Sequence, residues 1–216
     1  MLFKTSPEKF WNLIASKYAA SPISDRPAYE TKIQKVKTFL TPENVVLDIG
    51  CGTGTQCGDI ADNVKQVTGI DISRKLLAIA EQRKTQQITS GRKRDNVEFL
   101  QTSLFDERFQ SGRFDVVMAF HVLHFFDDID AVFKRIHELL KADGVFISET
   151  ASLGEKSKLT GKLLRFMGQL GLIPKINLLT TRQLELALEQ SGFRLVDKTR
   201  FSHSPDAEYT LIAKKI

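Results

Sequence analysis

The stretch VVLDIGCGTGTQCGD, residues 45–59, decides the fold of this chain. Its first residues form a short, mostly apolar run that is typical of a strand buried on both faces of a parallel sheet. Three glycines then alternate with other residues. Glycine adopts backbone conformations that other residues avoid, so the chain can turn sharply there and approach a ligand closely. We therefore predict a strand, a ligand-binding turn and a helix over 55–64.

Strand-like and helix-like segments alternate along the rest of the chain. Apolar runs typical of strands cover 66–71, 96–101, 114–120, 145–150, 193–201 and 208–216. Helical spacing of apolar residues predicts helices over 7–18, 29–40, 73–87, 129–144 and 180–192. This alternation favours right-handed crossover units and a parallel sheet. Only six residues, 202–207, join the last two strands, so we expect these two to pair antiparallel.

Two helix starts carry recognisable capping signals. Ser6 precedes Pro7 and Glu8, which places proline in the first turn and an acid at the positive end of the helix dipole. Thr180 and Gln183 have the spacing of a capping box. These signals predict helices that begin at about residues 7 and 181.

Composition restricts the class of protein. The 216 residues are 42% hydrophobic and 26% charged, as in a soluble globular domain, and no apolar run approaches the roughly 20 residues of a membrane span. The first residues lack the features of a secretory signal, so we expect a cytoplasmic protein. The only cysteines, Cys51 and Cys57, have no second pair or histidine at metal-ligand spacing, so we expect no metal site.

The net charge of +5 is unevenly distributed. Residues 1–150 contain 20 basic and 20 acidic side chains, whereas the remaining residues contain 11 and 6. Most of the excess lies in 151–180, where Lys and Arg alternate with Leu and Phe. This spacing favours the solvated face of an amphipathic helix over a nucleic-acid surface.

An acid at the end of the second strand makes the glycine turn a candidate nucleotide site. Asp71 follows Gly50 by 21 residues, a spacing that suits a carboxylate bound to ribose hydroxyls. A dinucleotide site requires a third glycine where this chain has Thr55, and a P-loop requires a lysine that the turn lacks. The turn therefore favours a ligand that brings no phosphate against it, and a dehydrogenase is disfavoured.

Four segments in order resemble the successive motifs of class I S-adenosylmethionine-dependent methyltransferases. They are VVLDIGCGTG, VTGIDIS, FDVVMAFHVLHFFDD and LLKADGVFIS, and they fall within residues 44–150. The chain is most similar to the small-molecule branch of ubiquinone and menaquinone methylases. The cofactor that this resemblance implies is S-adenosyl-L-methionine, with S-adenosyl-L-homocysteine as the product.

The resemblance implies a single α/β domain over 1–216. Its Rossmann-like, seven-stranded sheet is mostly parallel with the last strand antiparallel, and helices cover both faces. We expect four parts: an N-terminal helical cap (1–40), a cofactor-binding core (44–150), a basic amphipathic insertion or lid (151–180), and a C-terminal helix with an antiparallel hairpin (181–216).

The same resemblance implies roles for individual residues. Asp48 holds the methionine ammonium, and Asp71 takes the ribose hydroxyls while Ile72 packs on the adenine. The turn residues at which the backbone passes beneath the cofactor are Gly50, Cys51, Gly52 and Gly54. The backbone of Ala119 and Phe120 borders the reactive methyl group.

Adenine recognition departs from the family pattern. Many relatives place an Asp where this chain has Ser103, so the contact to the adenine amino group passes to the Ser103 hydroxyl, the Leu104 N–H or Asp106. The choice among these three stays open.

Methyl transfer from a sulfonium requires in-line alignment, exclusion of water and, for some acceptors, removal of a proton. His121 follows the fourth strand and is the candidate for a base or for substrate orientation. His124 is a second histidine near the site, and a packing role is favoured for it.

The acceptor site is expected from the parts that surround the core. Candidate substrate contacts are Trp11, Tyr18, His124 and Phe166, which implies a partly apolar small-molecule acceptor. The segment 151–180 is interpreted as a mobile lid, as a helix packed on the core, or as a peripheral contact with a membrane surface.

Two other classes of function remain as alternatives. The basic C-terminal third keeps an RNA or protein methyltransferase open, although AFHVLH lacks the Asn- or Asp-Pro-Pro-aromatic run of nucleic-acid amino-methyltransferases. A cofactor-binding partner subunit without catalysis is the second alternative. The oligomeric state is not predicted.

Overall fold

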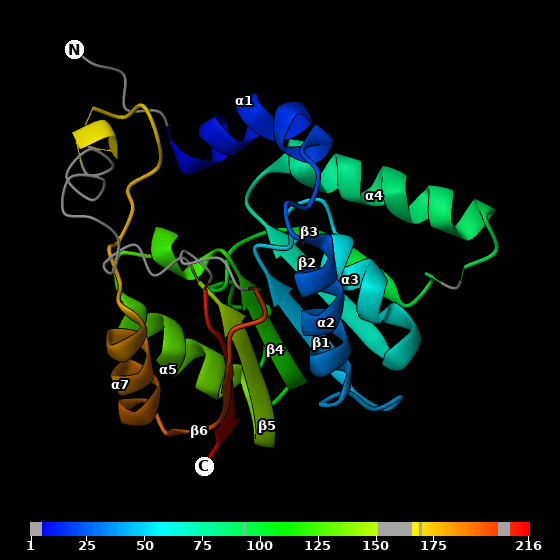
Figure 1. Cartoon of the computed structure of the whole chain (residues 1–216). Helices are drawn as coiled ribbons and strands as arrows, with labels where there is room; N and C mark the ends of the chain where they lie inside the picture. Colours follow the sequence, from blue (N-terminus) through cyan, green and yellow to red (C-terminus); the bar gives the residue numbers. More distant parts are fainter. Residues whose placement is uncertain (1–5, 93, 151–165, 169, 203–207) are drawn as a thin grey trace.

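The computed structural model describes residues 6–92, 94–150, 166–168, 170–202 and 208–216. Its core is one seven-stranded sheet with the order β3-β2-β1-β4-β5-β7-β6 (Figure 1). The strands are β1 Val45–Ile49, β2 Gln66–Asp71, β3 Val97–Gln101, β4 Phe114–Phe120, β5 Leu140–Glu149, β6 Phe193–Thr199 and β7 Thr210–Lys215. Only β7 runs antiparallel to its neighbours, as predicted for the last strand.

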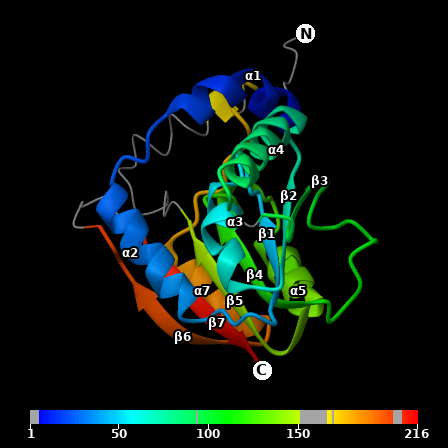
Figure 2. The ribbon, with the colours of Figure 1, turned by 90° about the vertical axis from the view of Figure 1, so that its right-hand side faces the viewer.

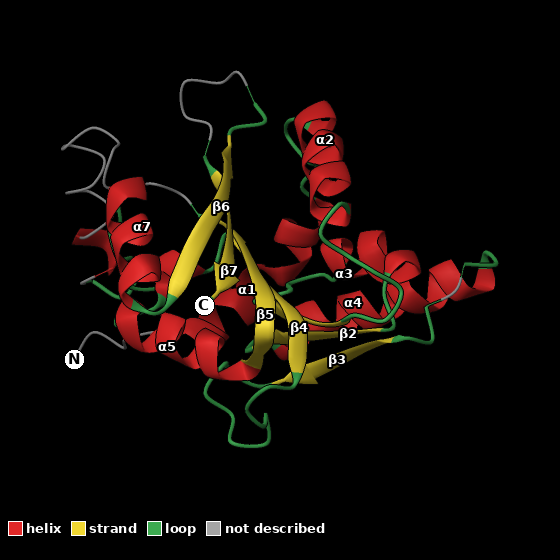
Figure 3. Cartoon of the chain, turned by 90° about the horizontal axis from the view of Figure 1, so that it is seen from below, coloured by secondary structure: helices red, strands yellow, loops and turns green. Residues whose placement is uncertain are grey.

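Helices cover both faces of the sheet, which confirms the α/β prediction (Figure 3). On one face lie α2 (Arg26–Lys37), α3 (Thr55–Ile60) with the short helix η1 (Ala61–Asn63), and α4 (Arg74–Thr89). On the other face lie α5 (Ile129–Leu139) and α7 (Thr181–Gln190). Two further helices are α1 (Pro7–Ala20), which packs on α4 (Figure 2), and η2 (Leu123–Phe125).

The structure contains the capping hydrogen bonds that the sequence predicts. Ser6 accepts a hydrogen bond from the Lys9 N–H at the start of α1, and Thr180 and Gln183 form both bonds of the capping box of α7. Each such cap is worth about 1 kcal/mol of helix stability. Sequence and structure therefore agree on where these helices begin.

Several predicted boundaries differ by two or three residues, such as those of α2, and the end of α5 differs by five. The apolar spacing extends a helix to residue 144, whereas α5 ends at Leu139 and β5 begins at Leu140. Leu140 is fully buried and pairs with Phe114 of β4, and a turn at Asp143, with a φ of 59°, follows within the strand. Burial in the sheet overrides the helical pattern here.

The carboxyl ends of the parallel strands meet at one edge, where ligands of open α/β sheets bind. The edge carries the glycine turn after β1, Asp71 at the end of β2, Phe120 at the end of β4 and Glu149 at the end of β5. The antiparallel β7 begins here too, because Thr210 pairs with Glu149.

The predictions of a lid and of no membrane-spanning segment can be compared with the described residues only in part. Most of the predicted lid, residues 151–165 and 169, lies outside them, so the lid stays a prediction. Among the helices that are described, none combines the length and the apolar character that crossing a membrane requires.

Candidate functional site

The glycine turn has the backbone conformation that its sequence predicts. Gly50, Gly52 and Gly54 all have positive φ, between 55° and 73°. A Cβ at Gly50 would lie 2.6 Å from a methyl of Val122, and one at Gly54 would lie 2.5 Å from the Phe99 ring. The turn is therefore packed against β3 and the segment after β4, with no room for a side chain at these two positions.

A cavity of about 220 Å³ lies against this turn at the carboxyl edge; we name it the first cavity. Ten predicted site residues line it. They are Gly50, Gly52, Asp71, Ile72, Ser103, Leu104, Phe120 and His121 from the sheet edge, and Trp11 and Tyr18 from α1. The sequence pattern thus brings most of the predicted cofactor contacts together around one space.

Asp71 is fixed beside the turn. Its carboxylate accepts hydrogen bonds from the Gly52 N–H at 3.0 Å and the Ser73 N–H at 2.7 Å. Burial raises its pKa, and the backbone donors, Ser73 first and then Gly52, oppose that rise. A carboxylate has about four acceptor positions, so Asp71 retains capacity for hydroxyl donors in the cavity.

Asp48 lies behind the turn rather than in the wall of the first cavity. It is 2% exposed, and the Cys57 thiol donates a hydrogen bond to it at 3.1 Å. Burial raises its pKa from 3.8 to about 7. A cationic group nearby would favour the ionised form, which is the requirement for holding an ammonium.

Other predicted contacts also lie outside the first cavity's lining. Ala119 is fully buried within β4, and Gly54 packs on Phe99. Cys51 is buried, and a Cβ at Gly69 would lie 2.9 Å from its Sγ, so its side chain packs against β2. Both cysteines are free, as small packing residues would be.

Aromatic rings form a wall between α1 and the segment after β4. The Trp11 ring is 5.8 Å from Tyr18 and 5.4 Å from Phe125, each in an edge-to-face arrangement. The Phe125 ring is 4.1 Å from His124. The Trp11–Phe125 contact joins α1 to η2 and typically contributes about 0.5–1.5 kcal/mol beyond burial, so it helps to hold α1 over the cavity.

His124 and Phe166 are placed less favourably for substrate contact. His124 is 7% exposed and does not line the first cavity, and burial lowers its pKa to about 4. Phe166 is exposed and does not line it either. The tentative substrate roles of both stay predictions.

The segment after β3 supplies three polar groups. Thr102 and Ser103 line the first cavity, as does Leu104. The Asp106 carboxylate is bound by Thr102 and Arg108, and these hydrogen bonds hold its pKa below the ordinary range. Of the three candidates for the adenine contact, Ser103 and Leu104 line the first cavity and Asp106 does not, and the contact itself stays a prediction.

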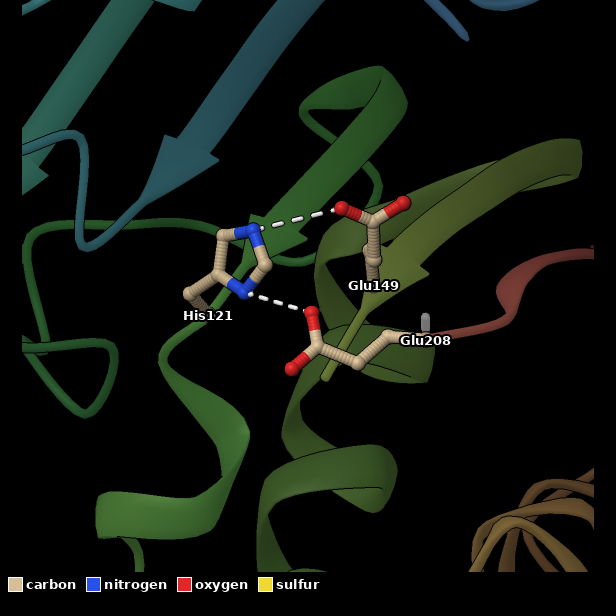
Figure 4. A group of neighbouring side chains, drawn as sticks. All are labelled: His121, Glu149 and Glu208. Carbon is tan, nitrogen blue, oxygen red and sulfur yellow. Dashed lines mark ion pairs between the residues drawn. The ribbon is translucent and has the colours of Figure 1, made fainter. Parts of the chain in front are cut away.

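His121 stands between two carboxylates. Its Nε2 lies 3.2 Å from Oε1 of Glu149, and its Nδ1 lies 3.3 Å from Oε2 of Glu208 (Figure 4). The Lys32 ammonium lies 2.6 Å from the same Glu149 oxygen. Although burial opposes it, the His121 hydrogen bond and the Lys32 charge lower the pKa of Glu149 to about 2.

This cluster borders a second cavity of about 520 Å³. Its polar lining consists of Ser24, Asp25, Tyr29, Lys32, His121, Glu149, Ser202 and Glu208. His121 lines both cavities. The second cavity therefore lies next to the first along the carboxyl edge, over β4 and β5.

Lys32, Glu149 and Glu208 are site residues that sequence reasoning missed. Glu149 ends a predicted strand at the ligand-binding edge, and that position is a signal that could have found it. Lys32 lies on the face of α2 that also carries buried Ile33 and Val36, where a buried lysine is not expected. Glu208 carries no local signal, because only β7 brings it to the edge.

His121, Glu149 and Glu208 also present three ligand atoms within 4.8 Å of one another. A cation there would compete with the Lys32 ammonium, which already neutralises Glu149. The arrangement thus fits a proton-binding imidazole better than a metal ion.

Comparisons with known proteins agree with this geometry. Residues 47–148, just under half of the chain, match the methyltransferase domain family. The ubiquinone biosynthesis O-methyltransferase of Idiomarina loihiensis is 32% identical over 130 residues, which are 60% of this chain and 51% of that protein. The chain spans about half the length of the curated relatives it matches.

Solved structures share the fold over nearly the whole chain. An S-adenosylmethionine-dependent methyltransferase from Mesorhizobium loti has a TM-score of 0.66 at 16% identity, with 87% of this chain and 98% of that chain covered. The cyclase SpnF has a TM-score of 0.75 at 18% identity, with 98% and 96% covered. These likenesses show the fold alone. The segment that matches the methyltransferase domain family, residues 47–148, carries the glycine turn and Asp71, both of which lie at the first cavity.

Proposed function

We propose that this chain binds S-adenosylmethionine in the first cavity and transfers its methyl group to a small molecule. The observation that carries the proposal is that Asp71 and the glycine turn, joined by a hydrogen bond, together line that cavity. The name of the ubiquinone biosynthesis relatives supports a small-molecule acceptor.

The residues present fit the cofactor. Gly50 and Gly52 present backbone without a side chain to the cavity, and Asp71 keeps acceptor positions for the two ribose hydroxyls. Ile72, which is 38% exposed, offers an apolar surface to the adenine, and Ser103 and Leu104 lie beside it. Asp48 supplies a carboxylate behind the turn for the ammonium.

When bound, the cofactor supplies an activated methyl group on a sulfonium. The chain's own task is to orient the acceptor and to exclude water. Trp11, Tyr18 and Phe125 cover the cavity from the α1 side, and His121 lies where the cavity meets the space over β4 and β5. The acceptor would reach the methyl group from that side.

Calorimetric titration with S-adenosylhomocysteine tests the proposal. We expect micromolar binding to the wild type and at least a tenfold weaker affinity for Asp71→Ala, because hydrogen bonds to a charged group contribute about 1.5–3 kcal/mol. The exposed Asp95→Ala is the matched control and should bind normally. A folded wild type that fails to bind would contradict the proposal.

A further inference from the structure

The backbone fixes His121 beside Glu149. His121 follows β4 with a φ of 55°, in the left-handed region that non-glycine residues seldom occupy. Its N–H donates to the Glu149 carbonyl at 2.7 Å. Since Phe120 pairs with Glu149 in the sheet, the register of β4 and β5 determines where the imidazole lies.

The Glu149 carboxylate is held from two further elements. Lys32 of α2 donates to Oε1 at 2.6 Å, and Thr210 of β7 donates to Oε2 at 2.7 Å. Lys32 is itself 6% exposed, with its ammonium 5.1 Å from the centre of the Phe120 ring. Glu149 therefore cannot swing away from His121 without leaving a buried ammonium unpaired.

Both imidazole nitrogens face a carboxylate, and this has a chemical consequence. A neutral imidazole has one N–H and can donate to one of the two acids, whereas the protonated form donates to both. With His121 protonated, two cations balance the charges of Glu149 and Glu208. The buried His124 nearby is held neutral by its environment and adds no opposing charge.

The remaining charged and titratable groups around the second cavity leave His121 as the group poised to take a proton. Asp25 accepts hydrogen bonds from the Ala28 N–H and the Ser202 hydroxyl. The Tyr29 hydroxyl donates to Asp59 at 2.6 Å, and burial raises its pKa. Both groups are thus held by neighbours, while His121 opens to both cavities.

The geometry points to a proton-accepting His121 that Glu149 and Glu208 position, and to a polar acceptor in the second cavity whose nucleophilic oxygen or nitrogen carries a proton. This inference rests on the proposed methyltransferase function. It assigns the second cavity to hydroxyl- or amine-bearing small molecules rather than to apolar ones, and it makes Glu149 and Glu208 positioning residues.

The step balances in atoms and charge. The bond from the methyl carbon to sulfur breaks, and sulfur keeps the electron pair as a neutral thioether. A bond from the same carbon to the acceptor oxygen or nitrogen forms, and the proton of that atom passes to His121. The positive charge moves from the sulfonium to the imidazolium between the two carboxylates, which stabilise it there.

Nuclear magnetic resonance tests the positioning without any acceptor. Long-range proton–nitrogen spectra of the ¹⁵N-labelled protein report the protonation of each histidine ring, and His121→Asn assigns its signals. In Glu149→Gln and in Glu208→Gln we expect the ratio of protonated to neutral His121 at pH 7 to fall about tenfold, since each loses a nearby carboxylate charge. The exposed Glu43→Gln should change nothing.

Glu208→Gln leaves Lys32 with its partner, so it keeps the test decisive if Glu149→Gln fails to fold. Unchanged His121 signals in the folded variants would overturn the positioning role. The His137 signals, from a ring that packs on Phe193, serve as the internal reference.

Transfer of tritiated methyl groups to four probes tests the acceptor class. Phenol and benzylamine carry a proton on the nucleophilic atom, whereas pyridine and dimethyl sulfide carry none. We expect label on a proton-bearing probe, and a much lower rate in His121→Asn, which lacks the proton acceptor. In Glu208→Gln, kcat should fall about tenfold to hundredfold, with S-adenosylhomocysteine affinity unchanged.

The possible results distinguish a wrong acceptor class, a metal site and a failure of the proposed function. Label on pyridine or dimethyl sulfide alone, or on no probe from a protein that binds S-adenosylhomocysteine, overturns the acceptor class. Transfer that requires added Mg²⁺ or Zn²⁺ and stops with EDTA assigns the cluster to a cation and also overturns it. Failure to bind S-adenosylhomocysteine overturns the proposed function itself.

Discussion

Single residues at the carboxyl edge of the sheet determine how close a ligand can lie to the backbone. Gly54 has a φ of 73°, and a Cβ there would meet the Phe99 ring at 2.5 Å. Gly91 has a similar φ of 82° but nothing within 4 Å. A substitution at Gly91 therefore tests the cost of the backbone conformation alone, whereas one at Gly54 adds the cost of the close contact.

We predict that Gly54→Ala lowers the free energy of unfolding by about 2–4 kcal/mol. About 1–2 kcal/mol comes from a Cβ in the left-handed conformation, and the rest comes from overpacking against Phe99. Gly91→Ala should lose only the contribution of about 1–2 kcal/mol that comes from the left-handed backbone conformation. Urea unfolding of both variants measures the difference, and equal losses would contradict the packing argument.

The buried Asp48 makes stability depend on pH. Its pKa in the folded chain is about 7, above its ordinary 3.8. Because the raised value lies in the folded state, the stabilising effect of the protonated acid is complete below about pH 4. It is lost as the pH rises towards 7, at about 1.4 kcal/mol per pH unit.

We therefore predict that Asp48→Asn stabilises the chain relative to the wild type at pH 8 and gains little at pH 4. The asparagine oxygen can still accept from Cys57, so the hydrogen bond is kept. Urea unfolding from pH 4 to 8 checks the difference between the two proteins. Parallel pH curves would show that Asp48 ionises normally.

Residue patterns predict part of the site and miss another part for a physical reason. Gly50, Gly52 and Asp71 carry local signals, because the turn after β1 and the acid at the end of the next strand belong to one short crossover. Lys32 and Glu149 carry none that links them, since they are 117 residues apart. The role of each charged residue can be recognised only when its distance from the other is known, and the sequence does not give that distance.

At the scale of elements, α1 is attached to the start of α4 by Asn12, while Arg83 of α4 donates to the Ala19 carbonyl near the other end of α1. Asn12 Oδ1 accepts from the Ser73 hydroxyl at 2.9 Å and from the Lys75 N–H at 3.0 Å. Ser73 also caps α4 by accepting from the Leu76 N–H. The position of α1, and with it Trp11 and Tyr18 in the wall of the first cavity, depends on this junction.

We predict that Asn12→Ala weakens S-adenosylhomocysteine binding about threefold to tenfold with a small loss of global stability. Two hydrogen bonds of about 1 kcal/mol each hold the helix that covers the cavity. Calorimetry measures the affinity, and tryptic cleavage at Lys9 and Lys17 should become faster. Leu13→Ala, at a neighbouring position that is 79% exposed, should leave both unchanged.

At the scale of the whole molecule, a buried ion pair joins α2 to the end of β5. Lys32 of α2 pairs with Glu149 of β5, and Thr210 of β7 shares the carboxylate. The side chains of Lys32 and Glu149 are 7% and 11% exposed, so water screens the pair weakly.

We predict that Lys32→Met lowers the free energy of unfolding by about 3–5 kcal/mol, because it leaves Glu149 buried without its cation. Arg26→Ala, which removes an exposed ion pair with Glu30 on the same helix, should cost less than about 1 kcal/mol. Chemical denaturation of both variants makes the comparison. Similar losses would mean that the buried pair contributes no more than a surface pair.

The sequence by itself determined the alternation of strands and helices, the glycine turn, Asp71 and the antiparallel last strand. Each depends on neighbours within a few dozen residues. It also extended α5 to residue 144, where burial of Leu140 in the sheet overruled the helical pattern. Local spacing therefore determines the order and type of the elements better than their ends.

Only the tertiary structure decided the surroundings of His121 and the second cavity. The insertion of β7 between β5 and β6 brings Glu208 and Thr210 to the end of β5, and α2 brings Lys32 there. Electrostatic and hydrogen-bonding effects depend on distances of a few ångströms and on exclusion of water. Those distances exist only after segments far apart in the chain have packed on one sheet edge.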